Sequence, residues 1–341
     1  MTAPWPRPVP PFLAAQAGAD ASVPAPAPRV RERLARRALH GVLLLDKPLG
    51  LTSNDALQRA RRALRAEKAG HTGTLDPLAT GLLPLCFGAA TKFAQVSLDG
   101  DKRYVATLRL GLTTTSGDAE GQWLRERPVA VTRADLEAAC RRWTGEIAQV
   151  PPMHSALKYR GRALYDYARA GIEVERAERG VTIHAIDIVA WDALRPQELT
   201  LDVRCSKGTY IRTLAEDLGE TLGCGAHLAA LRRTRSGPLS VADAVTLEAL
   251  EAMDDDARLA CVQPADLLLS DWPAIHLDAA EAGRFLTGLR RRTAAADCDH
   301  VRVYGPGTGA LLGSAHVRAG ELIADRLLSP AEVEALVPHS I

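Results

Sequence analysis

The order of the strand-like segments is the feature that most constrains how this chain folds. Residues 181–191 (VTIHAIDIVAW) and 198–208 (ELTLDVRCSKG) both alternate apolar and polar side chains, and only a short connection separates them. Such alternation is typical of half-buried strands, and residues 102–112 (KRYVATLRLGL) show it as well. Strands that follow one another without a helix between them predict a mixed or antiparallel sheet and an α+β fold, not a regular βαβ winding.

Helices are predicted between these segments. The expected helices cover residues 53–64, 132–143 and 213–221. The first should begin with Ser53 or Asn54 as its cap, because a short polar side chain there can accept a hydrogen bond from the first turn. Ahead of it, residues 41–48 (GVLLLDKP) form a short apolar strand.

A chain of 341 residues is long enough for about two domains. We expect residues 40–270 to form the larger domain, with a boundary after an acidic run at 254–256. Residues 271–341 contain short apolar segments separated by glycines, which favours a small β-barrel. Residues 284–292 (RFLTGLRRR) are counted among its short strands.

The first 39 residues have a different composition from the rest. They contain eight of the 21 prolines, and their six arginines against two acidic residues give a local charge of +4. A Pro/Ala-rich segment cannot bury enough apolar surface to offset its ordering entropy, so we predict a disordered basic arm. Such an arm is either an inert extension or a weak electrostatic aid to RNA binding.

Charge and cysteine content exclude several classes of protein. The 42 basic and 41 acidic residues leave a net charge of +1, which excludes nucleic-acid binding through bulk charge but not through local basic faces. The six cysteines are scattered without a CxxC pair, which argues against a zinc ribbon or a disulfide framework. No apolar run approaches the length of a membrane helix. We therefore expect a cytoplasmic protein in a reducing compartment.

One segment carries candidate chemistry, residues 70–84 (GHTGTLDPLATGLLP). Its glycines and Pro77 indicate a rigid, shaped loop, and a proline after Asp76 favours an extended aspartate whose side chain is aimed. The hydroxyls of Thr72 and Thr74 are available to hold the loop. Spacing alone also fits an ordinary Asp-Pro turn. A metal site is not expected, since His71 and Asp76 lack a third nearby ligand, and the GxxxxGK[ST] phosphate loop is absent.

Five segments together resemble the bacterial tRNA pseudouridine-55 synthases, the TruB family. They cover residues 41–58, 69–93, 101–111, 149–174 and 205–238. The resemblance implies a pseudouridine synthase catalytic domain over 40–270 and a PUA-like RNA-binding domain over 271–341. It also implies isomerisation of uridine to pseudouridine at position 55, in the T-loop of tRNA, by base flipping. No cofactor and no guide RNA would be needed, and we expect a monomer with no membrane partner.

The resemblance assigns the chemistry to three side chains. Asp76 matches the family's catalytic aspartate, which would attack ring carbon 6 or the anomeric carbon, or abstract a sugar proton. Arg212 matches the arginine that pairs with it and would keep it ionised and oriented. Tyr104 matches the tyrosine that stacks on the target ring.

Substrate binding is assigned to four further positions by the same resemblance. Tyr210 lies beside the uracil pocket, Leu231 contacts the base, and His71 occupies space vacated in the folded T-loop. Lys47 is either loop support or a phosphate contact. Cys205 and Cys224 are expected to be buried packing residues.

Basic side chains suggest where RNA would lie. One run precedes the loop, a second follows Leu231, and a third lies near the C-terminus; their members are Arg59, Arg61, Arg62, Arg65 and Lys68, then Arg232, Arg233 and Arg235, then Arg290 to Arg292. Phosphate contacts explain three such runs better than solvated faces do. A family insertion at about residues 150–182 is expected to grip RNA, and its His154 stands where relatives often have tyrosine.

Two other functions are compatible with these motifs. A protein of this fold could bind or fold RNA without turnover, but the intact set of Asp76, Tyr104 and Arg212 argues against it. A guide-RNA-dependent relative shares the catalytic loop but generally lacks the insertion, which this chain has. Guide-independent modification is therefore favoured.

Overall fold

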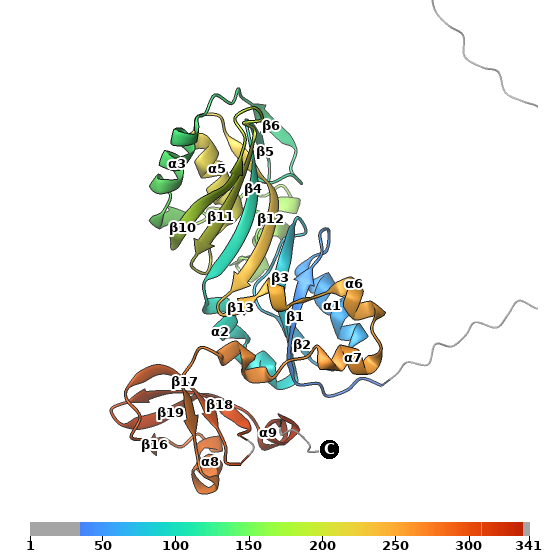
Figure 1. The fold of residues 1–341 in the computed structure, drawn as a ribbon, viewed down its shortest axis with the longest axis vertical. Coiled ribbons are helices and arrows are strands. Elements are labelled where there is room, and N and C mark those ends of the chain that lie inside the picture. The colour runs from blue at the N-terminus through green and yellow to red at the C-terminus, as the bar shows by residue number, and fades with distance from the viewer. Residues whose placement is uncertain (1–34, 308, 337–341) are drawn as a thin grey trace, which may run out of the picture. The chain divides into compact units, whose positions relative to one another are not determined.

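The long strands pair into one mixed ten-stranded sheet (Figure 1). In spatial order its main strands are β14 (Val245–Thr246), β1 (Gly41–Lys47), β3 (Ala79–Phe87), β12 (Ala226–Ser236), β4 (Lys102–Leu110), β11 (Glu198–Cys205), β10 (Arg179–Trp191) and β7 (Gly145–Gln149). Two short strands, β2 (Ala69–His71) and β13 (Leu239–Ser240), pair with β3 and β12. The β1–β14 and β3–β12 pairs are parallel and the others antiparallel, so the predicted mixed sheet is confirmed.

This computed structural model describes residues 35–307 and 309–336. Residues 1–34, most of the predicted arm, lie outside the described residues. Arg37 was expected in the arm, yet its backbone amide donates to the carbonyl of Arg65 at 2.7 Å and its guanidinium pairs with Asp255 at 2.6 Å. The ordered part of the chain therefore begins before residue 40.

Helices cover the sheet and connect its strands. They are α1 (Ser53–Ala63), α2 (Ala94–Asp99), α3 (Arg133–Arg142), α4 (Leu164–Arg169), α5 (Ile211–Thr221), α6 (Leu247–Ala252) and α7 (Asp255–Ala260), with 3₁₀ turns at Gly88–Phe93, Val241–Asp243 and Ala265–Leu269. The cap of α1 is Thr52, not Ser53 or Asn54, because its hydroxyl accepts the Asp55 amide at 3.1 Å. In the described ranges no helix is both long and apolar enough to cross a membrane.

Two apolar clusters hold the helices on the sheet. In the first, Leu136 of α3 and Leu214 and Leu218 of α5 are buried with side chains of β4, β10 and β11. Figure 1 shows α3 and α5 beside these strands. In the second, Leu57 of α1 packs with Leu43 of β1 and its neighbours. Each buried leucine contributes about 1.5–3 kcal/mol relative to exposure. This packing holds α5 against the sheet. Arg212 belongs to the first turn of α5 and is held next to the sheet with it.

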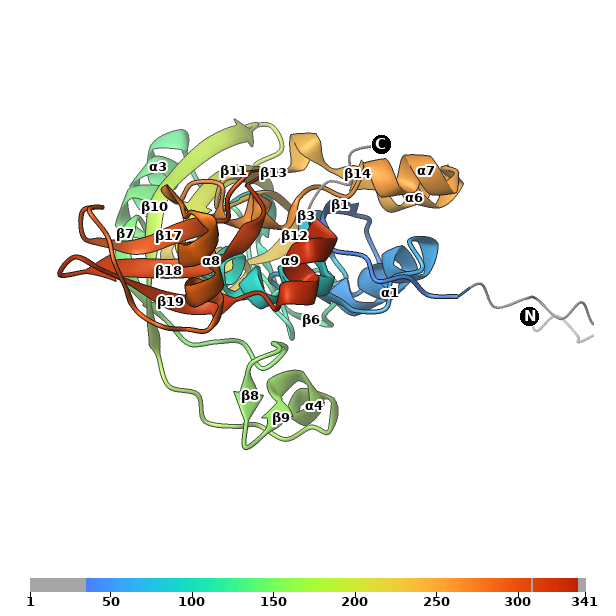
Figure 2. The same ribbon diagram turned by 90° about the horizontal axis from the view of Figure 1, so that it is seen from below.

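The C-terminal part is a curled five-stranded sheet. Its order is β15 (Ala274–His276), β17 (Cys298–Tyr304), β18 (Leu311–Arg318), β19 (Glu321–Leu327) and β16 (Arg291–Arg292). Phe285 of α8 (Ala279–Leu286) is fully buried with side chains of this sheet, and Figure 2 shows α8 beside the strands. α9 (Pro330–Leu336) ends the described chain. The expected strand at 284–292 is wrong except for its last two residues, which form β16. Its first residues end α8, because Asp278 caps that helix and Ala282 and Phe285 share one helical face.

Candidate active site

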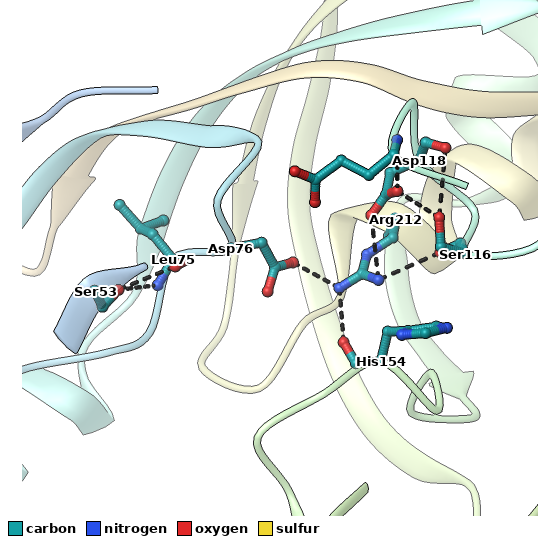
Figure 3. Close-up of polar contacts among 8 residues, drawn as sticks. Ser53, Leu75, Asp76, Ser116, Asp118, His154 and Arg212 are labelled. Carbon is teal, nitrogen blue, oxygen red and sulfur yellow. Dashed lines mark hydrogen bonds and ion pairs between the residues drawn. The ribbon is translucent and has the colours of Figure 1, made fainter. Parts of the chain in front are cut away.

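The loop at residues 72–78, which we call the Asp76 loop, joins β2 to β3 and is held from several sides. The Ser53 hydroxyl donates to the carbonyl of Leu75 at 3.0 Å and accepts its amide at 2.7 Å (Figure 3). The Thr72 and Ser97 hydroxyls are 2.9 Å apart, and the Gly50 amide donates to the carbonyl of Pro77 at 2.9 Å. The predicted rigid loop is thus shorter than 70–84, because residues 79–84 already belong to β3.

Asp76 faces a buried arginine across the end of this loop. The Arg212 Nη2 donates to Asp76 Oδ2 at 2.6 Å (Figure 3). The side chain of Arg212 is 6% exposed, whereas that of Asp76 is 44% exposed. The pair predicted from separate motifs is therefore present: a guanidinium locked in the protein orients a carboxylate that remains open to solvent.

Arg212 is itself held by two other segments. Its Nη2 donates to the carbonyl of His154 at 2.9 Å, and its Nη1 donates to that of Ser116 at 3.3 Å. The buried carboxylate of Asp118 lies 3.3 Å from the same Nη1. Asp118 in turn accepts the Ser116 hydroxyl and, at 3.1 Å, the Glu120 amide. Sequence reasoning missed Asp118, because nothing in its local sequence assigned it to Arg212.

A cavity of about 290 Å³ opens beside Asp76. Tyr104 of β4 and Leu231 of β12 line it, as predicted, because positions 104 and 106 pair with 233 and 231 across the two strands. Burial raises the pKa of Tyr104, and the neighbouring charge of Arg233 opposes that rise. The cavity therefore has one aromatic and one aliphatic wall, which suits a flat ring.

Tyr210 lines the same cavity, as expected, at the point where α5 begins. The buried side chain of Gln149 accepts the Tyr210 amide at 3.0 Å and donates to the Tyr210 carbonyl at 3.2 Å. This two-point contact places the tyrosine backbone. Sequence reasoning missed Gln149, whose role depends on a contact between residues 61 positions apart.

The interpretation of Arg233 as a phosphate contact is the sequence-based prediction that the structure changes most. It was grouped with Arg232 and Arg235 as a phosphate contact, but it is 1% exposed and lines the cavity. Its Nε donates to the carbonyl of Leu82 at 2.7 Å and its Nη2 to that of Gly73 at 3.1 Å. Alternation along β12 places Leu231 and Arg233 on the cavity side and Arg232 on the other.

Two predicted substrate-binding residues do not line the cavity. Lys47 is fully buried, and its Nζ donates to the carbonyls of Pro48 at 2.9 Å and Leu51 at 2.6 Å. Burial lowers its pKa to about 8. Its contacts match the loop-support alternative, and a phosphate contact is contradicted by its enclosure. His71 is half-buried on β2 with a pKa lowered by burial, and its buried Nδ1 has no hydrogen-bond partner among the described residues.

Much of the first basic run is neutralised within the protein. Arg59 pairs with Glu251 at 2.5 Å and Arg65 with Asp255 at 2.5 Å. Arg61 donates to backbone carbonyls of the following turn. These arginines attach α1 to α6 and α7, which weakens the phosphate interpretation of that run. Arg232 is likewise paired, with Asp46 at 2.7 Å.

The insertion, residues 150–178, differs from the first basic run because several of its arginines contact tyrosine rings. The small strands β8 (Lys158–Tyr159) and β9 (Arg162–Ala163) and helix α4 form one group (Figure 2). Three of its arginines lie on tyrosine rings at 4.9–5.3 Å from the ring centres; the pairs are Arg160 on Tyr159, Arg162 on Tyr167 and Arg169 on Tyr165. Arg162 also lies 3.9 Å from the Asp166 carboxylate, and Arg176 lies 3.5 Å from that of Glu173. The predicted end at 182 is late, since β10 begins at Arg179.

The cysteines offer no alternative chemistry. Cys205 and Cys224 are buried, as predicted. Burial raises the pKa of Cys205 to about 12, which keeps it a neutral thiol. Within residues 35–307 and 309–336, no three His, Cys, Asp or Glu side chains are grouped so that they could bind one metal ion.

Comparisons with known proteins point in one direction. The model of the TruB family pseudouridylate synthase N-terminal domain matches residues 61–211, and that of the tRNA pseudouridylate synthase B C-terminal domain matches residues 212–270. A protein of Ralstonia pickettii (strain 12J) named tRNA pseudouridine synthase B is 59% identical over 303 residues, which cover 86% of this chain and 95% of the relative. One of the same name from Verminephrobacter eiseniae (strain EF01-2) is 54% identical over 314 residues, 91% of this chain and 95% of the relative.

Solved structures share the fold at low identity. A chain in the archaeal box H/ACA sRNP Nop10–Cbf5 complex matches with a TM-score of 0.65 at 24% identity, covering 87% of this chain and 88% of that one. A chain in a Cbf5–Nop10–Gar1 complex gives 0.66 at 24% identity, covering 86% of each. At this identity the likeness concerns the fold alone.

Proposed function

Since the chain belongs to the TruB family of pseudouridylate synthases, we propose that Asp76 and Arg212 perform the family's reaction on the T-loop of tRNA, at position 55. The chain is a tRNA pseudouridine synthase, an isomerase that converts uridine in tRNA to pseudouridine. The T-loop position, the site residues and the mode of recognition are what we propose here.

One observation carries the site assignment: a half-exposed carboxylate is oriented by a buried guanidinium at the edge of a ring-sized cavity. Isomerisation breaks the bond between the sugar and N1, turns the base and forms a bond from the sugar to C5, while C5 loses a proton and N1 gains one. A carboxylate suits this reaction as a nucleophile at ring carbon 6 or the anomeric carbon, or as a base toward a sugar proton. All three routes need Asp76 ionised and aimed at the base.

The other cavity residues have distinct parts in this proposal. Tyr104 stacks on the flipped ring, Leu231 packs against it, and Tyr210 lies at its side. Arg212 holds one oxygen of Asp76 and does not need to move during the reaction, because Asp118 and two carbonyls already anchor it. Lys47 supports the turn that begins after β1 and does not touch RNA.

Recognition without a guide RNA is supported by the insertion. It places aromatic and arginine side chains next to His154, whose carbonyl contacts Arg212 directly. A segment that grips RNA at the rim of the site replaces what a guide would supply. The C-terminal five-stranded sheet is proposed as a second RNA-binding part, and the protein as a cytoplasmic monomer.

The reaction is tested with a T-arm stem-loop transcript and no added metal or guide RNA. Wild type should convert the uridine at position 55, and Asp76→Asn should bind the transcript without converting it. A transcript with cytidine at that position and the other loop uridines kept is the matched substrate control. Conversion of other uridines, or turnover by a clean Asp76→Asn preparation, would overturn the position or the site assignment respectively.

RNA binding in addition to turnover is the second candidate function. The insertion and the arginine-on-tyrosine pairs would serve a binding role equally well. Tight binding of the T-arm by Asp76→Asn, without product, would favour it.

A further inference from the structure

Three buried cations surround the Asp76 loop without a carboxylate in ion-pair contact. Lys47, Lys102 and Arg233 are 0%, 8% and 1% exposed. The Lys102 Nζ donates to the carbonyls of Ser97 at 3.0 Å and Leu98 at 2.8 Å, and the other two cations also donate to carbonyls. Among residues 35–307 and 309–336, none of the three forms a salt bridge.

Unpaired buried charge is costly and is rarely retained without a use. Moving a cation out of water costs several kcal/mol even after relaxation, and carbonyl dipoles offset this cost only in part. If donation to Leu82 and Gly73 were the only task at position 233, a neutral amide side chain could supply those hydrogen bonds. Asp76 acts on Lys47, and Asp99 and Asp101 act on Lys102, only through space. The buried charge of Arg233 therefore favours a negative group in the cavity beside it.

The cations also act on one another and on the cavity. Burial, and then the charge of Arg233, lower the pKa of Lys102 to about 8. Arg233 and Lys102 both line the cavity, whereas Lys47 does not. A Cβ on Gly73 would lie 3.2 Å from Arg233 Nη1, so the guanidinium directly underlies the loop that holds Asp76. Positive potential is thus concentrated on the floor of the cavity.

The reaction produces a negative charge in this place. When the bond between the sugar and N1 breaks, its electron pair stays with the base, and the uracil becomes an anion delocalised over N1, O2 and O4. That pair is used when C5 bonds to the sugar; the C5 proton then leaves and N1 takes up a proton, so the product is an isomer of the substrate. No other reactant is needed.

We propose that Arg233, assisted by Lys102, supplies the positive potential that stabilises the detached uracil anion. The inference rests on the proposed placement of the base in the Asp76 cavity. Preorganised charge in a site of low dielectric is effective because no solvent has to reorient as the negative charge develops.

A single-turnover comparison of uridine with 5-fluorouridine at the target position tests this role. Fluorine withdraws electrons and stabilises the ring anion by itself, so the substrate with fluorine depends less on the protein. The measured quantity is the rate at which the original nucleoside disappears, followed by nuclease digestion and mass spectrometry. Saturating enzyme separates this rate from binding. Arg233→Met and Arg233→Lys are compared with Arg232→Met, which removes a cation from the other side of the same strand.

Arg233→Met should lose on the order of 10²-fold in rate on uridine and clearly less on 5-fluorouridine, while Arg233→Lys recovers part of the loss. Arg232→Met should change both substrates by the same factor. Equal losses on both substrates in Arg233→Met and Arg233→Lys, no loss, or a defect confined to binding, as expected if the partner is an RNA phosphate, would each overturn the inference. Arg233→Lys also serves if the methionine variant fails to fold.

Asp76→Asn, measured alongside on uridine, separates the inference from the proposed site. Full turnover by that variant would refute the placement of the base in this cavity. Its inactivity together with equal losses in the Arg233 variants would refute only the role of Arg233.

Discussion

The Asp76 loop and the insertion both border the cavity, but they are held in opposite ways. The Asp76 loop is bonded by side chains from other elements, including Ser53, Ser97 and Arg233. The insertion is stabilised mainly within itself, by contacts such as the Leu164 amide to the Leu157 carbonyl at 2.8 Å. The Arg212 guanidinium contacts both, through Asp76 and the His154 carbonyl.

This difference corresponds to two tasks, which are catalysis in the Asp76 loop and RNA binding in the insertion. A nucleophile must be preorganised, since misplacement by a fraction of an ångström is costly in rate. A segment that grips RNA gains from adjusting to its partner, and long arginine and tyrosine side chains on a small support allow that. Arg212 connects the two regions, because its guanidinium orients the Asp76 carboxylate and also contacts the insertion through the His154 carbonyl.

The largest effect should come from Asp76→Asn. We expect turnover to fall by at least on the order of 10³-fold, because an amide lacks the charge that the reaction needs. Thermal stability and T-arm affinity should stay close to wild type, since the Asp76 side chain is 44% exposed. Pseudouridine assay, thermal melting and filter binding measure the three quantities. A comparable loss of turnover in His154→Ala, which keeps the backbone carbonyl, would contradict this division between catalysis in the Asp76 loop and RNA binding in the insertion.

Two glycines sharpen the comparison of packing. Gly81 and Gly161 have φ of +99° and +82°, so alanine is strained at both. At Gly81 a Cβ would also lie 2.3 Å from the Arg233 carbonyl, whereas at Gly161 nothing lies within 4 Å. We expect Gly81→Ala to lower the free energy of unfolding by about 3 kcal/mol and Gly161→Ala by about 1 kcal/mol. Equal losses in urea denaturation would show that the two regions are packed alike.

Arginines of the insertion and of the first basic run should differ in whether they contact RNA phosphates. Arg160→Gln should weaken T-arm binding and reduce the slope of log affinity against log salt by about 1, as expected for a lost phosphate contact. Arg59→Gln should leave that slope unchanged and lower stability slightly, because Arg59 already pairs with Glu251. Salt titrations of binding and denaturation curves measure both. A change of slope in Arg59→Gln instead would restore the phosphate interpretation of the first basic run.

The smallest effect is a pH dependence of stability that arises at Glu216, one turn after Arg212 in α5. Burial, and then the charge of Asp217, raise the pKa of Glu216 from 4.5 to about 7. The folded protein therefore retains a proton that the unfolded chain releases, and this group makes stability fall as pH rises from about 4.5 to about 7. Glu216→Gln should remove that decline, so its stability relative to wild type should increase as pH rises through this window.

Denaturation at several pH values between 4 and 8 measures this difference. Glu175→Gln, at an exposed position in the insertion, is the matched control. A difference between wild type and Glu216→Gln that does not change with pH would contradict the assignment.

Local patterns were sufficient for the elements and for part of the site. Alternation identified β4, β10 and β11, and Thr132 does cap α3 with a capping box. The family motifs identified Asp76 and Arg212, which the structure brings to 2.6 Å. The same methods failed at residues 284–292, where an amphipathic helical turn was mistaken for a strand.

The sequence by itself determined which side chains could carry chemistry, because residue type and the order Asp76-Pro77 are local properties. Only the tertiary structure decided which cations are buried. Arg233 and Arg232 are adjacent and identical in type, yet one lies under the cavity and the other pairs with Asp46. That choice depends on the register in which β12 pairs with β3 and β4, which lie more than a hundred residues earlier in the chain, because register decides which face of the sheet each side chain takes. Desolvation is a property of the surroundings, so no pattern of letters in one segment encodes it.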